Sequence, residues 1–311
     1  MKLFEAINSF TAYKYLTVKA NTIYGYDGYL RHFSIFLRNP EIEDITLDDV
    51  VEYLRWTEDA GYKANTREKY ALAIQELVRF FEKQGLPVIK SELIPVPRKE
   101  YNLPRVSKEE DFIKLIQSIP INSGAYYDIR NLTVLWLLHD SGCRLGEIAS
   151  INMSNLDLKE RSVIIKSEKQ RDGMPYRKIF WYNKPTTQAM ERWVKKREEL
   201  LQKTIIEDKD ALFLSVNGGV CADGRSGRRV DIEALGEMIR KQSRRAGLNY
   251  TLNAHSQRHA LGRKLAERGA NNSIISGVLG HKSLDSSRVY TILHGKELQN
   301  VFIRIMGKKS A

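Results

Sequence analysis

The chain has 311 residues, of which 42% are hydrophobic, and it carries a net charge of +12. That length is sufficient for about two domains with hydrophobic cores. No apolar run approaches the roughly 20 residues that span a bilayer, and the first residues lack the apolar segment of a signal peptide, so we expect neither a membrane helix nor secretion. The two cysteines, Cys143 and Cys221, are too few for a disulfide framework or a zinc cluster, which favours a reducing cytoplasm.

The positive charge is distributed unevenly along the chain. Residues 1–100 contain 14 Lys and Arg against 15 Asp and Glu, a net charge of −1. The remaining residues contain 36 against 23, a net charge of +13. Such an excess is typical of a protein that binds a polyanion, although a basic solvated surface would give the same composition.

Apolar residues at spacings of three and four predict a bundle of helices in residues 1–90. We expect helices to start at Asn21-Thr22, after Thr46 and at Asn65-Thr66, and Gly85 to end the last of them.

Prolines then mark a break in the chain. Four of the eight prolines lie within 18 residues, which predicts an extended linker: Pro87, Pro95, Pro97 and Pro104. Ser107 and Glu110 form a predicted capping box that opens a second domain. The predicted organisation is a helical domain at 1–98, a linker at 99–106 and a second domain at 107–311.

The second domain is predicted to be mainly helical, with one small antiparallel β-hairpin. Its strands are expected at 162–166 and 177–181, around a turn at Asp172-Gly173. Residues 217–229 are expected to form a loop, either a surface loop or one whose arginines contact phosphate: Arg225, Arg228 and Arg229. The helices are expected at 107–118, 125–141 ending at Gly142, a short one from Arg144, 186–203, 231–246, 254–268, 272–279, 284–292 and 296–306.

Four short motifs follow one another in this second half. They are Ser141-Gly142-Cys143-Arg144-Leu145-Gly146-Glu147, His255-Ser256-Gln257-Arg258-His259, Leu279-Gly280-His281-Lys282 and Val289-Tyr290. Arg258 precedes His281 by 23 residues, and His281 precedes Tyr290 by nine. Each motif alone is weak, but their order and spacing are specific.

These residue types suit chemistry on a phosphodiester. Arg144 and Arg258 each offer a fixed fork of donors that stays charged, and Arg144 is expected at a helix N-terminus, which also favours an anion. His255 and Arg258 are three residues apart, so both can reach the same phosphate. The phenol of Tyr290 titrates near pH 10 and needs cationic surroundings to attack at neutral pH. The histidines could instead indicate a metal, but no carboxylate or cysteine keeps ligand spacing with them.

The motifs and their spacing resemble those of the tyrosine recombinases, the phage-integrase family, over almost the whole chain. The resemblance implies that Tyr290 is the nucleophile, that His255 transfers a proton, and that His281 donates to a non-bridging oxygen. It also implies that Glu147 orients the catalytic histidine by contacting the histidine and not the substrate. His259 is interpreted as a packing or supporting residue beside His255.

The general acid is expected on the hairpin. The family places a lysine on the hairpin, usually in Gly-Lys-Gly-x-Lys-x-Arg, whereas this chain has Lys166-Ser167-Glu168-Lys169-Gln170-Arg171. Lys169 is nearest the predicted turn and is the first candidate, with Lys166 as the alternative. Arg171 is a poor acid because guanidinium releases its proton too reluctantly.

The resemblance further implies a SAM-like core-binding domain followed by an α+β catalytic domain. Duplex DNA is the expected partner, with Thr66 and Arg67 as candidate contacts, and neither a metal nor ATP is expected. Two subunits are expected on each site and four in the synapse. The apolar stripe of residues 295–306 fits a helix that packs on its own domain or docks into a neighbouring subunit. A type IB topoisomerase and a catalytically silent DNA-binding regulator remain alternatives.

Overall fold

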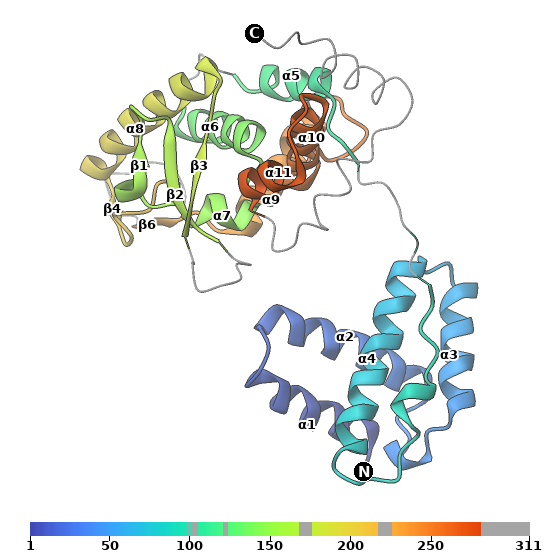
Figure 1. Cartoon of the computed structure of the whole chain (residues 1–311). Helices are drawn as coiled ribbons and strands as arrows, with labels where there is room; N and C mark the ends of the chain where they lie inside the picture. The colour runs from blue at the N-terminus through green and yellow to red at the C-terminus, as the bar shows by residue number, and fades with distance from the viewer. Residues whose placement is uncertain (99, 101–104, 121–123, 168–175, 217–225, 281–311) are drawn as a thin grey trace. The chain divides into compact units, whose positions relative to one another are not determined.

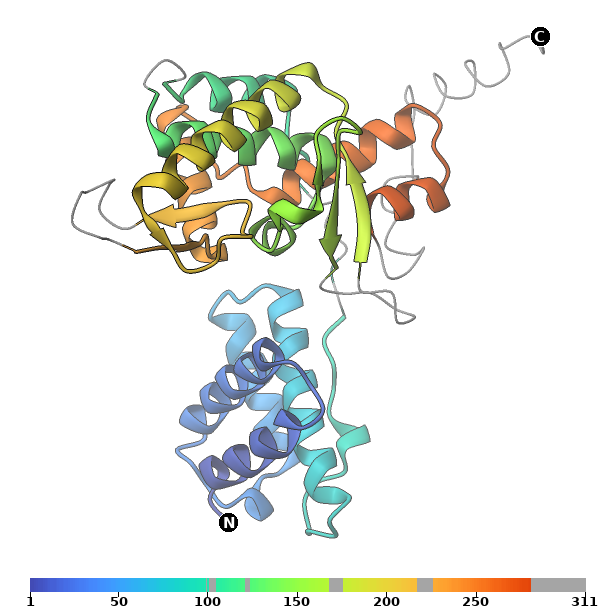
Figure 2. The same cartoon turned by 90° about the vertical axis from the view of Figure 1, so that its left-hand side faces the viewer.

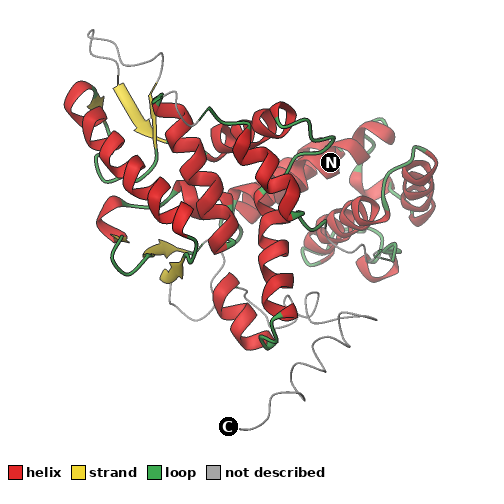
Figure 3. Ribbon diagram, turned by 90° about the horizontal axis from the view of Figure 1, so that it is seen from above, coloured by secondary structure: helices red, strands yellow, loops and turns green. Residues whose placement is uncertain are grey.

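The computed structural model describes residues 1–98, 100, 105–120, 124–167, 176–216 and 226–280. The chain divides into two compact units, 1–102 and 103–311 (Figure 1). Helices predominate in the described residues, and the strands are few and short (Figure 3). None of the helices described is both long enough and apolar enough to cross a bilayer. The predicted fold class, mainly α with small antiparallel strands, is confirmed.

The first unit is the predicted helical bundle (Figures 1 and 2). Its helix α4 contacts the other three, and two 3-10 turns complete the unit. Apolar side chains of all four helices form one buried cluster, which includes Phe10, Phe33, Tyr53 and Leu77. The helices are α1 (Leu3–Tyr15), α2 (Ala20–Phe36), α3 (Leu47–Asp59) and α4 (Ala64–Glu82), and the turns are η1 (Ile42–Asp44) and η2 (Ser91–Leu93).

Only one of the three predicted helix starts in this unit is confirmed. Thr46 caps α3, where its hydroxyl accepts from the Asp49 N–H at 3.2 Å and its own N–H donates to Asp49 at 2.8 Å. In contrast, α2 and α4 begin after Lys19 and Lys63, so the predicted Asn-Thr caps lie inside the first turn. For α4 the reason is packing, because Ala64 is buried in the bundle and extends the helix by one residue.

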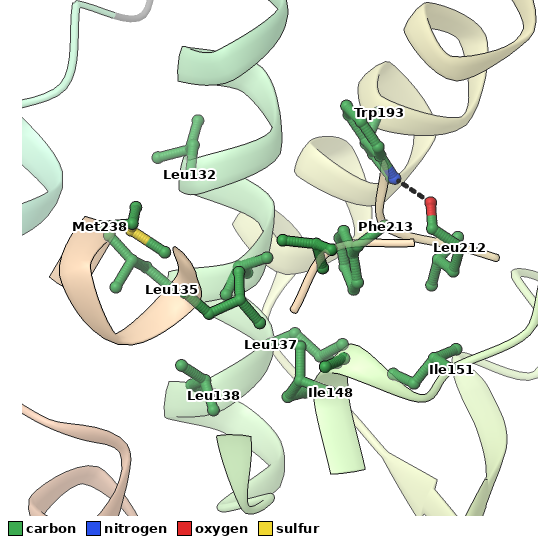
Figure 4. Packing of buried hydrophobic residues seen from close by; sticks show 14 of the residues in the cluster. Leu132, Leu135, Leu137, Leu138, Ile148, Ile151, Trp193, Leu212, Phe213 and Met238 are labelled. Atoms are coloured by element: carbon green, nitrogen blue, oxygen red, sulfur yellow. Dashed lines mark hydrogen bonds between the residues drawn. The ribbon is translucent and has the colours of Figure 1, made fainter. Parts of the chain in front are cut away.

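The second unit is organised around α6 (Tyr126–Ser141), which contacts α8 (Lys184–Lys203) and α10 (Ala254–Glu267). Twelve of the sixteen residues of α6 are buried, as expected for a helix in the interior of its unit. Figure 4 shows its leucines in one buried cluster with Met238, Phe213 and Trp193. The indole N–H of Trp193 donates to the Leu212 carbonyl at 3.0 Å. The other helices are α5 (Glu109–Gln117), α7 (Leu145–Ala149), α9 (Ile232–Arg245) and α11 (Asn272–Leu279), and the turn η4 is Met153–Asn155.

Two small three-stranded sheets lie in the second unit. The predicted hairpin is confirmed as β2 (Ser162–Lys166) and β3 (Tyr176–Phe180), extended by β1 (Leu156–Asp157). Its register pairs Val163 with Ile179 and Ile165 with Arg177. The second sheet was not predicted. It has the order β4 (Ile205–Ile206), β6 (Ser226–Arg229), β5 (Leu214–Val216), so the end of the predicted loop 217–229 is in fact a strand. Strands of two to four residues are too short to show the alternation that identifies a strand.

The start of α5 also differs from the prediction. Lys108, not Ser107, is the cap residue, and the helix begins at Glu109. The N–H of Ser107 donates instead to the carbonyl of Ser256 in α10, at 3.3 Å. This bond holds Ser107 in the segment before the helix, so the predicted capping box with Glu110 is wrong.

Candidate active site

A tight turn at Gly142 joins α6 to α7. Gly142 has φ 59°, and its N–H closes α6 on the Leu138 carbonyl at 3.0 Å, as the sequence predicted. There is no room for a side chain here, because a Cβ would lie 2.9 Å from Leu279 and 3.0 Å from Leu261. The turn therefore packs directly against α10 and α11, and the next residues along the chain are Cys143 and Arg144.

Arg144 occupies the position predicted for it, at the start of α7. Its N–H donates to Glu147 Oε2 at 2.9 Å, and its Nη1 donates to Glu147 Oε1 at 3.0 Å. The Glu147 side chain is completely buried, whereas the Arg144 side chain is 17% exposed. The buried carboxylate thus holds the guanidinium at a helix N-terminus, with part of it open to solvent.

The carboxylate of Glu147 is held ionised. Burial raises its pKa, but the Arg177 guanidinium, the Arg144 N–H and the Arg144 charge together outweigh burial, and the pKa lies below its usual value. Two arginines around one carboxylate leave a net positive charge at this turn. Such a place is suited to an oxyanion of phosphate.

Arg258 reaches the same turn from α10. Its Nη1 donates to the carbonyl of Gly142 at 2.8 Å, and the side chain is almost fully buried. The helix starts at Asn253, whose side chain accepts from the Ser256 N–H at 2.8 Å. Arg258 therefore contacts the turn that Arg144 follows by two residues along the chain. That the two arginines bind one phosphate stays a prediction.

The two histidines of the second motif differ in their surroundings. His255 lies exposed in the first turn of α10, three residues before the buried Arg258. His259 is half-buried, and burial, followed by the charges of His255 and Arg258, lowers its pKa to about 4. A histidine with that pKa is neutral at pH 7, which fits the packing or supporting role predicted for His259.

Comparison with known families accounts for this arrangement. The sequence model of the "Phage integrase family" matches residues 108–297, which is more than half of the chain. The chain belongs to the phage integrase family. A second model, "Phage integrase, N-terminal SAM-like domain", matches residues 7–85, which coincide with the helical bundle. The resemblance inferred from the four motifs is thus confirmed.

Curated members of the family match along most of their length. Tyrosine recombinase XerC of Corynebacterium efficiens is 24% identical over 306 residues, covering 97% of this chain and 91% of that protein. Tyrosine recombinase XerD of Mycobacterium tuberculosis is 25% identical over 301 residues, covering 92% and 91%.

Solved structures of the family share the fold. The XerH site-specific recombinase bound to palindromic difH substrate, a post-cleavage complex, matches with a TM-score of 0.71 at 18% identity, covering 98% of this chain and 96% of that one. A lambda integrase (75–356) dimer bound to a COC' core site matches with a TM-score of 0.69 at 15% identity, covering 95% and 97%.

Several predicted site residues lie outside the described residues: Lys169, Arg225, His281 and Tyr290. Their roles stay predictions, as does the pairing of Glu147 with a catalytic histidine. Lys166, the alternative acid, is exposed at the end of β2, where it pairs with Tyr176.

The candidate DNA contacts are in different surroundings. Arg228 is 61% exposed beside Asp231, so it is accessible to a partner. Arg229 instead bonds Asp208 at 2.7 Å, the carbonyls of Ala149 and Ile151, and the Asn152 side chain. This network favours a structural role for Arg229 in joining β6 to the segment after α7. Its contact with DNA stays a prediction.

The two candidates in the first unit both lie in the first turn of α4. Arg67 forms an ion pair with Glu58 of α3 at 2.8 Å. Thr66 is half-buried beside it. Their contact with DNA stays a prediction.

Arg177 belongs to this site and was not predicted. It lies on β3, and its Nη2 donates to Glu147 Oε2 at 2.9 Å. The signal that could have found it is strand alternation, since Arg177 and Ile179 share the inward face of the hairpin while Tyr176, Lys178 and Phe180 are exposed. An arginine at an inward position of a strand requires a buried partner.

Proposed function

We propose that this chain is a site-specific DNA recombinase that cuts and rejoins duplex DNA through a 3′-phosphotyrosyl intermediate. The observation that supports the proposal is that Arg258 bonds the Gly142 turn, which Arg144 follows by two residues and where Arg144 bonds an ionised Glu147. Their positions in sequence agree with the register of His281 and Tyr290. Relatives named tyrosine recombinase, similar over nearly the whole chain, support the same activity.

In the proposed reaction the Tyr290 hydroxyl attacks the scissile phosphorus and His255 accepts its proton. The bond from phosphorus to the 5′ oxygen breaks, and Lys169 protonates that oxygen as it leaves. Arg144 and Arg258 donate to the non-bridging oxygens, whose negative charge grows in the transition state. Rejoining is the reverse attack by a 5′ hydroxyl, so the energy of the broken bond is kept in the phosphotyrosine, and neither ATP nor a metal is needed.

We propose double-stranded DNA in the cytoplasm as the partner, with two subunits on each site and four in the synapse. The solved lambda integrase structures include a dimer bound to a core site and a tetramer bound to a Holliday junction. The net charge of +13 beyond residue 100 is consistent with a polyanionic partner.

The test uses nicked duplexes prepared from a pool of genomic fragments. Cleavage near the nick releases a short strand that diffuses away, so the strand cannot be rejoined and the covalent intermediate accumulates. We expect the wild-type protein to form an adduct that survives denaturation, and Tyr290→Phe to bind the same DNA without forming it. Tyr182→Phe is the matched control, since that phenol is exposed in the same unit, and it should form the adduct normally.

Three results would contradict the proposal. An adduct of normal yield in Tyr290→Phe would remove the nucleophile. Binding without any adduct in the wild type would indicate a silent regulator. Relaxation of supercoiled DNA by an enzyme that never exchanges strands between two sites would indicate a topoisomerase.

A further inference from the structure

Arg177 joins three separate parts of the second unit. Its Nη2 donates to Glu147 of α7 at 2.9 Å and lies 3.8 Å from the sulfur of Cys143. Its Nη1 donates to the carbonyl of Val278, in the last turn of α11, at 2.9 Å. The Arg177 side chain is 8% exposed and the Glu147 side chain is completely buried, so the ion pair between them is shielded from water.

A buried ion pair of this kind is a weak source of stability. Moving a guanidinium and a carboxylate out of water costs several kcal/mol for each ion, and apolar side chains of similar size are often equally stable in such places. Packing alone therefore does not explain why an arginine occupies this position. What the arginine adds over an apolar residue is a defined geometry, because its planar fork of donors fixes the groups that it bonds.

One consequence concerns Arg144. The two oxygens of Glu147 are divided between the arginines, since Oε1 accepts from Arg144 Nη1 and Oε2 accepts from Arg177 Nη2. Bonds to both guanidinium groups fix the plane of the Glu147 carboxylate. The carboxylate in turn fixes the orientation of the Arg144 guanidinium. It also leaves Arg144 with less than one full compensating charge, so that its attraction for an anion is retained.

A second consequence concerns the end of α11. Gly280 ends this helix with φ 66°, and a Cβ at Gly280 would lie 2.6 Å from Arg177 Nε and 2.9 Å from its Cζ. The backbone of the turn thus lies directly on the guanidinium, and the Val278 carbonyl bonds it from the preceding turn. His281 is the next residue in the chain.

We propose that Arg177 is a positioning residue for DNA cleavage: it holds Glu147 against Arg144 and fixes the end of α11, from which the chain continues to His281. This inference rests on the proposed function, because it assigns Arg177 to the same reaction. Among the described residues, the charged groups that act on the Cys143–Glu147 turn are Arg144, Arg177 and Arg258. Burial raises the pKa of the Cys143 thiol to about 11, so the thiol is neutral.

The first experiment requires no DNA and compares the stability of the whole protein with that of Arg177→Met across pH. Among the charged groups, Arg177 makes the largest contribution to lowering the Glu147 pKa, and burial opposes it. A carboxyl with a depressed pKa stabilises the fold above its unfolded pKa of about 4.3, and this stabilisation is lost as the pH falls through the folded pKa. Arg177→Met removes this contribution while burial still opposes ionisation, so the Glu147 pKa rises and its stabilisation of the fold at neutral pH decreases.

The expected difference between wild type and Arg177→Met is therefore largest at pH 7 and shrinks on acidification. At pH 7 we expect the unfolding equilibrium constant, measured in urea, to increase roughly 10²-fold or more. Arg240→Met is the matched control, since Arg240 is 55% exposed beside Glu237 and its loss should change little at any pH. A difference that does not vary with pH would overturn the proposal.

The second experiment measures cleavage by Arg177→Lys, which keeps the charge and remains informative if Arg177→Met fails to fold. A single ammonium group cannot bond Glu147 and Val278 in the same fixed plane. We expect adduct formation at saturating DNA to slow by about 10- to 100-fold, with an unchanged DNA concentration at half saturation. The probe is the nicked duplex from the genomic pool with which the wild-type protein forms its adduct.

The outcomes separate the two proposals. Cleavage by Arg177→Lys at the rate of wild type and Arg240→Met would overturn the positioning role while leaving the recombinase proposal intact. If neither wild type nor Arg240→Met forms an adduct, the proposed function fails, and the pH dependence of stability still decides whether Arg177 keeps Glu147 ionised.

Discussion

At the scale of single residues, Arg144 is the predicted phosphate contact that can be tested most cleanly. It is partly exposed and bonded to Glu147, whereas Arg258 is buried and bonded to the backbone of Gly142. Removing Arg258 would disturb the junction of α6 and α10 together with the chemistry. Removing Arg144 leaves Glu147 its bond to Arg177, so the fold should survive.

We therefore expect Arg144→Ala to slow cleavage by roughly 10²–10³-fold while DNA binding falls only slightly. The reason is that a donor aimed at charge developing in the transition state contributes little to binding the ground state. Adduct formation at saturating DNA and a gel-shift titration measure the two quantities. Arg240→Ala serves as the control for loss of a surface charge, and an equal fall in binding and cleavage in Arg144→Ala would show a simple affinity contact.

The general acid can be identified with a substrate that does not need one. A 5′-bridging sulfur at the scissile phosphate leaves as a thiolate of much lower pKa, so the step no longer depends on a proton donor. We expect Lys169→Ala to be slow on ordinary DNA and near wild type on the sulfur substrate, while Arg144→Ala stays slow on both. Rescue of Lys166→Ala instead would assign the acid to the end of β2, and rescue of neither would place it outside the hairpin.

Some residues of this site contact partners that are close in sequence, and others contact partners that are far away in sequence. His255 and Arg258 are three residues apart, and helical spacing alone predicted that they lie on one face. The bond between Arg144 and Glu147 was not predicted, because the resemblance paired Glu147 with a histidine. The approach of Arg258 to Gly142 is a tertiary contact, for which the resemblance to a family served as the guide. Arg177 had neither signal, and its role depends on α7 and α11 meeting β3 in space.

At the scale of elements, the junction of α6, α10 and α11 determines where the arginines lie. Gly142 is both in a left-handed conformation and pressed against Leu261 and Leu279. We expect Gly142→Ala to lower the free energy of unfolding by about 1–2 kcal/mol for the backbone and by a further ~1–3 kcal/mol for overpacking. Gly247→Ala is the matched control, because Gly247 has φ 70° with nothing within 4 Å of a Cβ, and only the backbone cost applies.

Urea unfolding measures both variants, and Gly142→Ala should also lose cleavage because the Arg258 bond to the Gly142 carbonyl shifts. Equal destabilisation of the two variants would show that the junction accommodates the added methyl group with no loss of free energy from overpacking.

Most helices of the second unit could be predicted from periodicity, since long apolar patterns such as that of α8 are strong signals. The hairpin was predicted for the same reason. The helix caps were less predictable, because Lys19, Lys63 and Lys108 cap their helices by backbone conformation without a side-chain bond. The sheet of β4, β5 and β6 forms between segments that carry almost no pattern of their own.

At the scale of the whole molecule, the two units have separate hydrophobic cores. The cluster of the bundle and the clusters of the second unit share no residue. We expect the units to unfold as separate cooperative bodies.

Leu77→Ala tests this independence, because Leu77 is buried in α4. It should destabilise the bundle by about 2–5 kcal/mol. Hydrogen exchange followed by mass spectrometry should show faster exchange across α1 to α4 and unchanged exchange in α6, α8 and α10. Leu72→Ala, an exposed leucine on the same helix, should change neither unit. Faster exchange throughout the chain would mean that the units unfold together.

The central claim concerns the covalent bond between protein and DNA. The most direct measurement is mass spectrometry of the trapped adduct after digestion with protease and nuclease, which identifies the modified residue and the end of DNA attached to it. We predict a single modified peptide in which Tyr290 carries the phosphate of a DNA 3′ end, with a free 5′ hydroxyl on the released strand. A phosphate on any other residue, or attachment through a 5′ end, would contradict the account.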